Sequence, residues 1–263
     1  MIKRNFAFYC FLMLFTIQLK LQAQSVSPQV IASAGGYQAN GIGSLSFTIG
    51  ETVTQTFESS NNILTQGFQQ PFKATLNLKL YLQGYYANSG FMENVLFNQG
   101  VTAMSGTECD TIEIQLRQST PPYNIVSTSK SILQTNGTAN FSGNANLGEL
   151  NYIVIKHRNT IESWSANPVL INENTYYDFS VGSNQVFGSN QSEVENGVWA
   201  LYTGDINQDE NIDLLDLGIV DGDINNFIFG FFATDINGDG NVDLLDNPIV
   251  EGNVNGFVFA IKP

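Results

Sequence analysis

The sequence predicts a mainly β protein: a β-sandwich over about residues 74–203, preceded by a short β-hairpin region and followed by a small domain with helices. Short alternating runs recur every ten to twenty residues, with Gly, Asn and Ser between them. No helical periodicity longer than two turns occurs before residue 210, and a repeated unit fills the last 59 residues. Regular short strands without intervening helices indicate a sandwich or barrel rather than a parallel α/β sheet.

The first residues have the pattern of a secretory signal peptide. Lys3 and Arg4 precede an apolar run from Phe6 to Ile17, and Ala23 offers a small residue at the cleavage position. This pattern predicts a signal peptide over 1–23 and a secreted or cell-surface protein that begins near Gln24. The apolar run is too short for a spanning helix, and no later stretch approaches the roughly 18 apolar residues needed, so we expect no membrane span.

Strands are predicted on both sides of Pro71. In the N-terminal β segment (24–73), alternating runs at 44–49, 52–57 and 63–68 are separated by turn residues. In the sandwich module (74–203), the predicted strands are 76–86, 111–118, 138–143, 151–158, 163–171, 176–181 and 198–206. The last of these strands extends past the end of the module.

The negative charge is concentrated at the C-terminal end. The chain carries a net charge of −14, and residues 205–263 hold 12 acidic side chains against one basic side chain, a net of −11. This balance argues against nucleic acid and anionic membranes as partners. A charge so localised requires a local explanation.

That explanation is a duplicated calcium-binding pattern in the predicted domain 204–263. Residues 205–229 and 235–259 are identical at 15 of 25 positions, and each unit opens with a twelve-residue loop that carries oxygen-bearing side chains at positions 1, 3, 5, 7, 9 and 12. Calcium prefers six to eight oxygen ligands, with a backbone carbonyl at position 7 and often a water at position 9. The pattern predicts two calcium ions, held by Asp205, Asn207, Asp209, Asn211, Asp213 and Asp216, and by Asp235, Asn237, Asp239, Asn241, Asp243 and Asp246.

The two loops differ at position 6, where the sharp turn favours a positive φ. Gly240 suits that conformation, whereas Glu210 replaces the glycine in the first loop at a cost of about 1 kcal/mol. We therefore expect the second site to bind calcium more tightly. Ile212 and Val242 at position 8 are apolar, which predicts that the two loops pair through a short strand-like contact.

Residues 205–263 resemble the dockerin domain of secreted bacterial proteins. The resemblance rests on Asp rather than Glu at position 12, on the missing helix before each loop, and on two loops within about 60 residues. It implies a fold built around two calcium ions and docking to a cohesin domain, often in the assembly of polysaccharide-degrading enzymes. Two alternatives for the acidic loops are a solvated surface loop and a thrombospondin-like calcium array, and the apolar stretch between the loops speaks against the latter.

The chain departs from the dockerin pattern at loop positions 10 and 11. Many dockerins carry a polar Ser-Thr pair there, whereas this chain has the candidate partner-binding residues Leu214, Leu215, Leu244 and Leu245. Two interpretations stay open for these leucines and for the Phe-x-Phe sets at 227–229 and 257–259: the domain's own core packed on the sandwich, or a surface for a cohesin-like protein partner. Asn247-Pro248 predicts the start of the second helix, and Gly222 and Gly252 predict the helix ends.

Two upstream segments, 33–57 and 152–169, resemble stretches of secreted and surface proteins of Bacteroidetes, in which a β module precedes a dockerin-like end. That resemblance implies location and architecture only.

The sequence favours a non-catalytic protein. His157, the sole histidine, lies between Lys156 and Arg158 beside a predicted hairpin turn, which indicates a surface polar cluster. A catalytic zinc site usually needs more than one histidine, and acidic neighbours disfavour a Cys109 thiolate. The alternative function is a carbohydrate-binding or hydrolytic component of polysaccharide breakdown. Its candidate aromatic residues for glycan stacking are Trp164, Trp199, Tyr81, Tyr85, Tyr86, Tyr176 and Tyr177.

Overall fold

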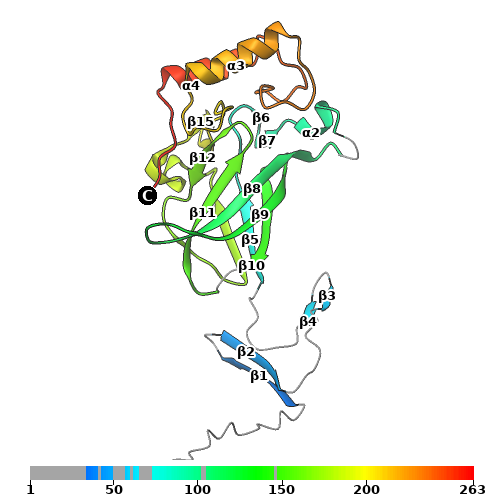
Figure 1. Ribbon diagram of the computed structural model, residues 1–263, viewed down its shortest axis with the longest axis vertical. Helices are drawn as coiled ribbons and strands as arrows, with labels where there is room; N and C mark the ends of the chain where they lie inside the picture. Colours follow the sequence, from blue (N-terminus) through cyan, green and yellow to red (C-terminus); the bar gives the residue numbers. More distant parts are fainter. Residues whose placement is uncertain are drawn as a thin grey trace, which may run out of the picture. The chain divides into compact units, whose positions relative to one another are not determined.

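The structure is a computed structural model that describes residues 34–40, 43–49, 57–59, 62–64, 73–101, 105–144 and 147–263. Side chains are described for 74–101, 105–143 and 147–263. The chain divides into two units, Met1–Gln70 and Pro71–Pro263, which we treat separately (Figure 1). The predicted signal peptide, 1–23, lies outside the described residues.

The first unit contains two antiparallel hairpins. Strands β1 (Ala34–Asn40) and β2 (Gly43–Ile49) pair over their full lengths, and β3 (Phe57–Ser59) pairs with β4 (Asn62–Leu64). The predicted strand at 44–49 is confirmed. Residues 51–56 and 65–68, which complete the other two predicted runs, lie outside the described residues.

The second unit contains two larger sheets. The three-stranded sheet has the order β10 (Thr138–Asn144), β5 (Lys73–Lys79), β14 (Asn174–Asp178), with β5 and β14 parallel. The five-stranded sheet has the order β12 (Thr160–Trp164), β11 (Leu150–His157), β8 (Glu108–Gln118), β9 (Ile125–Gln134), with β13 (Val169–Leu170) also on β11. Shorter elements are β6 (Tyr86–Asn88), β7 (Phe91–Met92), α2 (Val95–Asn98), η1 (Ser183–Gln185), η2 (Phe187–Ser189), β15 (Ser192–Glu195) and β16 (Val198–Ala200).

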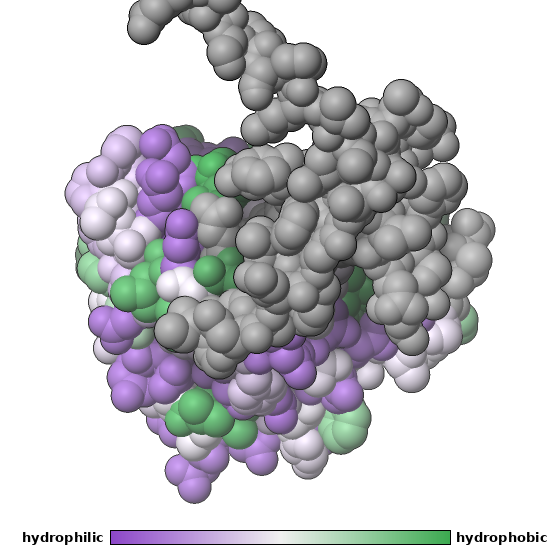
Figure 2. Space-filling model, turned by 90° about the horizontal axis from the view of Figure 1, so that it is seen from below, coloured by the Kyte–Doolittle hydropathy of each residue, from purple (hydrophilic) through white to green (hydrophobic). Residues whose placement is uncertain are grey.

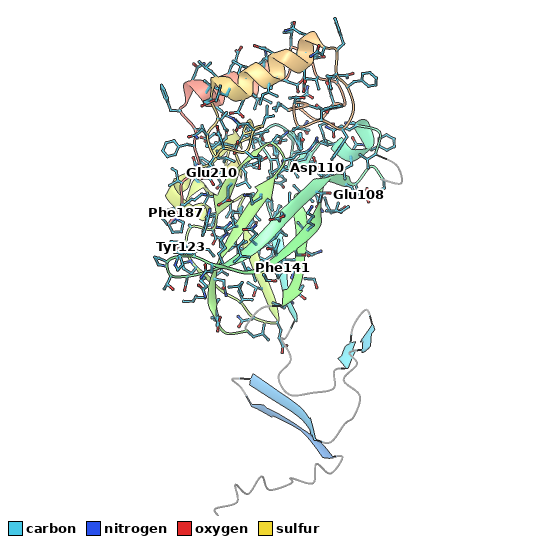
Figure 3. All side chains as sticks on the ribbon, in the orientation of Figure 1. Glu108, Asp110, Tyr123, Phe141, Phe187 and Glu210 are labelled. Carbon is cyan, nitrogen blue, oxygen red and sulfur yellow. The ribbon has the colours of Figure 1, made fainter. Side chains whose placement is uncertain are left out.

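Side chains from both sheets form one buried cluster, consistent with the predicted β-sandwich. Every second residue of β5 is buried, including Leu76 and Leu78, as expected for a strand with one face on a core. They share the cluster with Ile112 and Ile114 of β8 and with Phe141 of β10, which lies within the sandwich (Figure 3). Seen from below, the described surface is mostly hydrophilic, with small separate hydrophobic areas (Figure 2).

Several of the predicted strands in this region are broken or shorter than expected, and one strand was missed. The strand predicted over 76–86 is broken, because β5 ends at Lys79 and β6 begins only at Tyr86, and the strand predicted over 198–206 ends at Ala200. The predicted strand 163–171 is broken, because β12 ends at Trp164 and β13 begins only at Val169, after a bend that precedes Pro168. Strand β9 was not predicted, although it pairs with most of β8. Its residues are largely polar and Leu133 is its only buried residue, so the strand lacks the alternation that identifies a half-buried one.

The C-terminal residues form a small helical part at one end of the sandwich (Figure 1). Helix α3 spans Leu214–Asn225 and helix α4 spans Asn247–Asn255. They enclose a separate buried cluster, to which Ile161 of β12 also belongs; the other buried members are Ile212, Val220, Ile236, Val250 and Val258. Among the described residues, no helix combines the length and apolar character needed to cross a bilayer.

The predicted helix ends are wrong by three residues. Gly222 and Gly252 lie inside α3 and α4 rather than after them. Each helix is instead followed by a phenylalanine with positive φ, Phe227 at 54° and Phe257 at 52°. The start of α4 is close to the prediction, since Asp246 is the N-cap and Pro248 lies in the first turn.

Candidate metal-binding loops and the exposed apolar surface

The two acidic loops, loop 1 (205–216) and loop 2 (235–246), share one backbone conformation. Position 4 has positive φ in both, 60° at Gln208 and 78° at Gly238. Position 6 also has positive φ in both, 76° at Glu210 and 91° at Gly240. The predicted turn at position 6 is therefore present, and Glu210 adopts the left-handed conformation that side chains other than glycine disfavour.

The carboxylate at position 12 is fully buried in each loop and closes the loop on itself. Asp216 Oδ1 accepts from the backbone amides of positions 2 and 3 at 2.8 and 3.1 Å, and its Oδ2 accepts from the amide of position 9 at 3.0 Å. Asp246 repeats these contacts at 2.6, 3.0 and 2.8 Å. In loop 1, position 9 also caps the helix that follows, because the Asp213 carboxylate accepts from the Leu215 amide at 2.7 Å.

The side chains at positions 3 and 5 brace the exposed side of each loop. Asn207 Oδ1 accepts from the Asp209 amide at 2.9 Å, and Asp209 Oδ1 accepts from the Asn211 amide at 3.0 Å. In loop 2 the corresponding distances, for Asn237, Asp239 and Asn241, are 2.9 and 2.8 Å. Asp209 Oδ1 and Asp239 Oδ1 also accept from the side-chain amide at position 7, at 3.3 and 3.1 Å. The Oδ1 atoms of Asn207 and Asn237 accept one N–H each from described residues, so their second lone pair leaves an acceptor site for a cation.

The carboxylate at position 1 differs between the loops. Asp205 is only 2% exposed, and its Oδ1 is buried without a hydrogen-bond partner among the residues that the structure describes. Burial and the nearby Asp216 and Asp209 carboxylates raise the pKa of Asp205 to about 6. In loop 2, both Asp235 oxygens are satisfied, since Oδ1 accepts from the Gly238 amide at 2.8 Å and Oδ2 from the Gly240 amide at 2.8 Å.

The pKa values of the loop 2 carboxylates are also raised. Burial raises the pKa of Asp246 to about 6, while backbone amides and the nearby Asp235 have smaller effects. Burial likewise raises the pKa of Asp235, against the lowering effect of a hydrogen bond from Gln99. Within the residues the structure describes, no three His, Cys, Asp or Glu side chains converge on one point in a metal-binding arrangement.

The predicted pairing of the two loops with each other is wrong. The Ile212 amide donates to the Val258 carbonyl at 2.9 Å, and the Val242 amide donates to the Ile228 carbonyl at 3.1 Å. Each loop thus pairs with the segment that follows the other helix, and the bridges Asn211–Phe259 and Phe229–Asn241 repeat the exchange. Ile212 and Val242, the apolar residues at position 8, are both buried. Their backbone contacts join each loop to the other repeat rather than to the other loop.

Loop 2 is packed tightly against the sandwich. A Cβ atom added to Gly240 would lie 2.4 Å from the Asn98 carbonyl oxygen, and one added to Gly238 would lie 2.5 Å from Val95 Cγ2. The two glycines therefore allow α2 to lie close to loop 2, and they also allow the positive φ angles of the loop turns. Their counterparts in loop 1, Gln208 and Glu210, keep the same φ signs without glycine.

The leucines at positions 10 and 11 are exposed, so the interpretation that they form the domain's core is wrong. Leu214 and Leu244 are each 72% exposed, and Leu215 and Leu245 are each 65% exposed. Phe227 and Phe257, which follow the helices, are 85% and 83% exposed. Large apolar side chains are thus exposed at matching positions of the two repeats.

His157 is buried rather than part of a surface cluster. It is 4% exposed, and its ring nitrogens contact Thr160 Oγ1 at 2.9 Å and Asp110 Oδ2 at 3.1 Å. Arg158 Nε donates to the same Asp110 oxygen at 2.9 Å. Figure 3 places Asp110 at the end of the sandwich that faces the helical part. No local pattern predicts this pairing, because Asp110 and His157 lie 47 residues apart.

The buried Asp110 carboxylate predicts a dependence of stability on acid. Burial opposes its ionisation, but His157 and Arg158 outweigh that effect and lower the pKa of Asp110 to about 2. In an unfolded chain the pKa of an aspartate is about 3.9. Because the folded-state pKa is the lower one, this stability is complete above about pH 4 and is lost as the pH falls towards 2.

The measurement is urea unfolding at pH 5 and pH 2 in the presence of a chelator. The difference between the two pKa values corresponds to about 2.6 kcal/mol in full, of which about 2 kcal/mol is lost between pH 5 and pH 2. The unsubstituted protein should therefore lose about 2 kcal/mol more than Asp110→Asn over this interval. Equal losses in the two proteins would show that Asp110 is not a source of the acid sensitivity.

Cys109 is buried, and most of the candidate aromatic residues for glycan stacking are buried or half-buried. Burial, and next the Asp110 charge, raises the pKa of the Cys109 thiol well above its usual range. Among the aromatic residues, Tyr176 is 62% exposed, while Tyr86 is half-buried and donates to Glu195 at 2.6 Å. The others are buried (Trp164, Tyr81 and Tyr85) or half-buried (Trp199 and Tyr177).

Comparisons with known proteins give no family. No family model and no curated protein matches the sequence. The chain is similar to one in the crystal structure of a C-terminal interface mutant of the type II cohesin–X-dockerin complex from Acetivibrio cellulolyticus, with a TM-score of 0.42 and 13% identity over 68% of this chain and 94% of that chain. An N-terminal interface mutant of the same complex gives a TM-score of 0.41 with the same identity and coverage. A likeness of this size does not define a family.

Proposed function

We propose that the chain is a secreted or cell-surface docking module without catalytic activity, and that its C-terminal part binds two calcium ions and a protein partner. The proposal combines the oxygen-bearing positions of the two loops with the exposed leucines at loop positions 10 and 11. Burial of both His157 and Cys109 is compatible with the absence of catalysis, because neither side chain is accessible to a substrate.

The unpartnered Asp205 oxygen is the observation that carries the calcium proposal. A buried carboxylate oxygen without a hydrogen-bond donor is costly, and a cation in the loop would offset that cost. The facing acidic groups that raise the Asp205 pKa would be neutralised by the same ion. Oxygen-only donors on a loop with tight turns suit calcium rather than zinc or copper.

The ligands would have to draw together around each ion. Positions 1, 3, 5 and 12 supply side-chain oxygens, position 7 a backbone carbonyl, and position 9 a water-mediated contact. The loop backbones already have the turns needed at positions 4 and 6. When bound, calcium would supply positive charge that holds these anionic oxygens together, and its binding would stabilise the folded helical part.

The exposed leucines support a protein partner rather than the chain's own sandwich. The sandwich is contacted by loop 2 through Gly238 and Gly240, whereas the leucine pairs face solvent. Residues 205–263 have a net charge of −11, so a partner that offers an apolar surface with basic residues around it would complement this part. A cohesin-like domain is the partner class that the dockerin resemblance suggests.

The docking prediction is tested by replacing leucines at both repeats. In Leu214→Ser/Leu215→Ser/Leu244→Ser/Leu245→Ser, a partner captured from the source organism's surface proteins should bind at least tenfold more weakly, because apolar anchors at an interface centre contribute about 1–2 kcal/mol or more each. Surface substitutions change stability little, so the unfolding temperature should stay near that of the unsubstituted protein. Affinity is measured by calorimetry with the identified partner.

The matched control is Leu150→Ser/Leu170→Ser, which removes two leucines that are about half exposed on the five-stranded sheet. This variant should keep its partner. If the control loses binding while the four loop-associated substitutions do not, or if the captured ligand is a glycan, the proposed docking surface is wrong.

A further inference from the structure

A side chain from the sandwich reaches the first calcium-binding position of loop 2. Gln99, which follows α2 directly and is buried, donates from Nε2 to Asp235 Oδ2 at 2.6 Å. These two residues are 136 positions apart in the sequence. The contact therefore depends on the packing of the helical part against the sandwich.

Arg158 fixes the orientation of the Gln99 side-chain amide. Its Nη2 atom donates to Gln99 Oε1 at 2.8 Å, which leaves the amide nitrogen of Gln99 directed at Asp235. Arg158 is itself held by Asp110, by the Tyr85 hydroxyl at 2.8 Å, and by the Phe232 carbonyl just before loop 2. Its guanidinium also lies 4.3 Å from the centre of the Phe231 ring.

We propose that Gln99, oriented by Arg158, is a positioning residue for the second calcium site: it fixes the Asp235 carboxylate before the ion binds. This inference rests on the proposed binding of calcium. Side chains that hydrogen-bond to metal ligands orient those ligands, and their removal typically weakens metal binding by roughly 10–100-fold. Gln99 would thus set part of the affinity of loop 2 from outside the helical part.

Loop 1 has no equivalent support at position 1. Within the described part of the chain, the Asp205 carboxylate accepts only from the Glu210 amide, through Oδ2 at 3.3 Å, and its Oδ1 has no partner. Besides its Ile212–Val258 contact, loop 1 is linked to the sandwich through Glu210, which pairs with Lys262. Lys262 also lies 3.3 Å from Glu162 of β12. The two sites should therefore respond differently to the loss of Gln99.

The test measures each loop alone by calorimetric calcium titration of the full chain. In a background of Asp205→Ala/Asp209→Ala, only loop 2 remains, and Gln99→Met should weaken its calcium affinity at least tenfold. In a background of Asp235→Ala/Asp239→Ala, only loop 1 remains, and Gln99→Met should leave its affinity within twofold. Metal-free thermal melts of every variant establish that each one is folded before titration.

Gln83→Met is the matched control, because Gln83 is a glutamine at the same junction that does not contact a loop carboxylate. It accepts from Asn253 Nδ2 at 2.7 Å and from the Thr203 amide at 3.2 Å. Its substitution should lower the unfolding temperature but leave loop 2 affinity unchanged. The inference fails if Gln99→Met leaves loop 2 affinity unchanged or tighter, or if Gln83→Met weakens it equally. If the unsubstituted protein binds no calcium, the proposed function itself is wrong.

Discussion

Replacing Asp235 and Asp239 by alanine should abolish calcium binding at loop 2 and remove the stability that this ion confers. A ligand at 100 times its Kd stabilises the folded state by about 2.7 kcal/mol per site. The double variant should therefore show a much smaller rise in unfolding temperature when saturating calcium replaces chelator. Asp235 is buried at position 1, and Asp239 at position 5 lies on the exposed side of the loop, so the pair removes ligands from both sides of the ion.

The control for this experiment must remove equal charge elsewhere in the acidic part. Asp221→Ala/Glu251→Ala does so, because both residues are exposed on α3 and α4 and neither lies in a loop. This control should gain as much stability from calcium as the unsubstituted protein. If Asp235→Ala/Asp239→Ala responds to calcium like the control, the assignment of loop 2 as a calcium site is wrong.

Gly84→Ala should destabilise the junction between the sandwich and the helical part. A Cβ atom at this position would lie 2.1 Å from the Ile236 carbonyl oxygen and 3.2 Å from Ile236 Cγ2. A backbone oxygen inside loop 2 cannot turn away as a flexible side chain can, so the loop must shift. Overpacking of this kind costs about 1–3 kcal/mol, which we expect as a fall in the free energy of unfolding.

The opposite result is expected for a glycine without neighbours. Gly218 lies inside α3 and a Cβ atom there would meet nothing within 4 Å, so Gly218→Ala should stabilise the protein by about 0.5–1 kcal/mol. Urea unfolding in chelator measures both variants. A Gly84→Ala protein as stable as the unsubstituted one would mean that loop 2 does not pack on the sandwich at this point.

The local features of the loops could be predicted from the sequence because their chemistry repeats at fixed spacing. The oxygen-bearing positions, the turn at Gly240 and the strain at Glu210 are properties of neighbouring residues. The alternation on β5 similarly identified one face of the sandwich. These signals come from neighbouring residues and do not depend on where distant segments of the chain lie.

Features that depend on distant segments could not be predicted. The Gln99–Asp235 contact and the Asp110–His157 pair each join residues far apart in the chain, so no local pattern marks them. The pairing of each loop with the segment that follows the other helix could not be predicted for the same reason, because it also joins residues from different repeats. Exposure of Leu214 and Leu244 depends on which side of each loop end is covered by other segments, and a Leu-Leu pair in sequence fits a core as well as a surface.

Calorimetric titration of the full, chelator-treated chain with calcium tests the central claim most directly. The two loops predict a stoichiometry of two calcium ions per chain, with loop 2 the tighter site. Saturation at two ions that is lost stepwise in Asp205→Ala/Asp209→Ala and Asp235→Ala/Asp239→Ala would support the proposed function. A titration without heat of binding, and without any change in unfolding temperature on adding calcium, would contradict it.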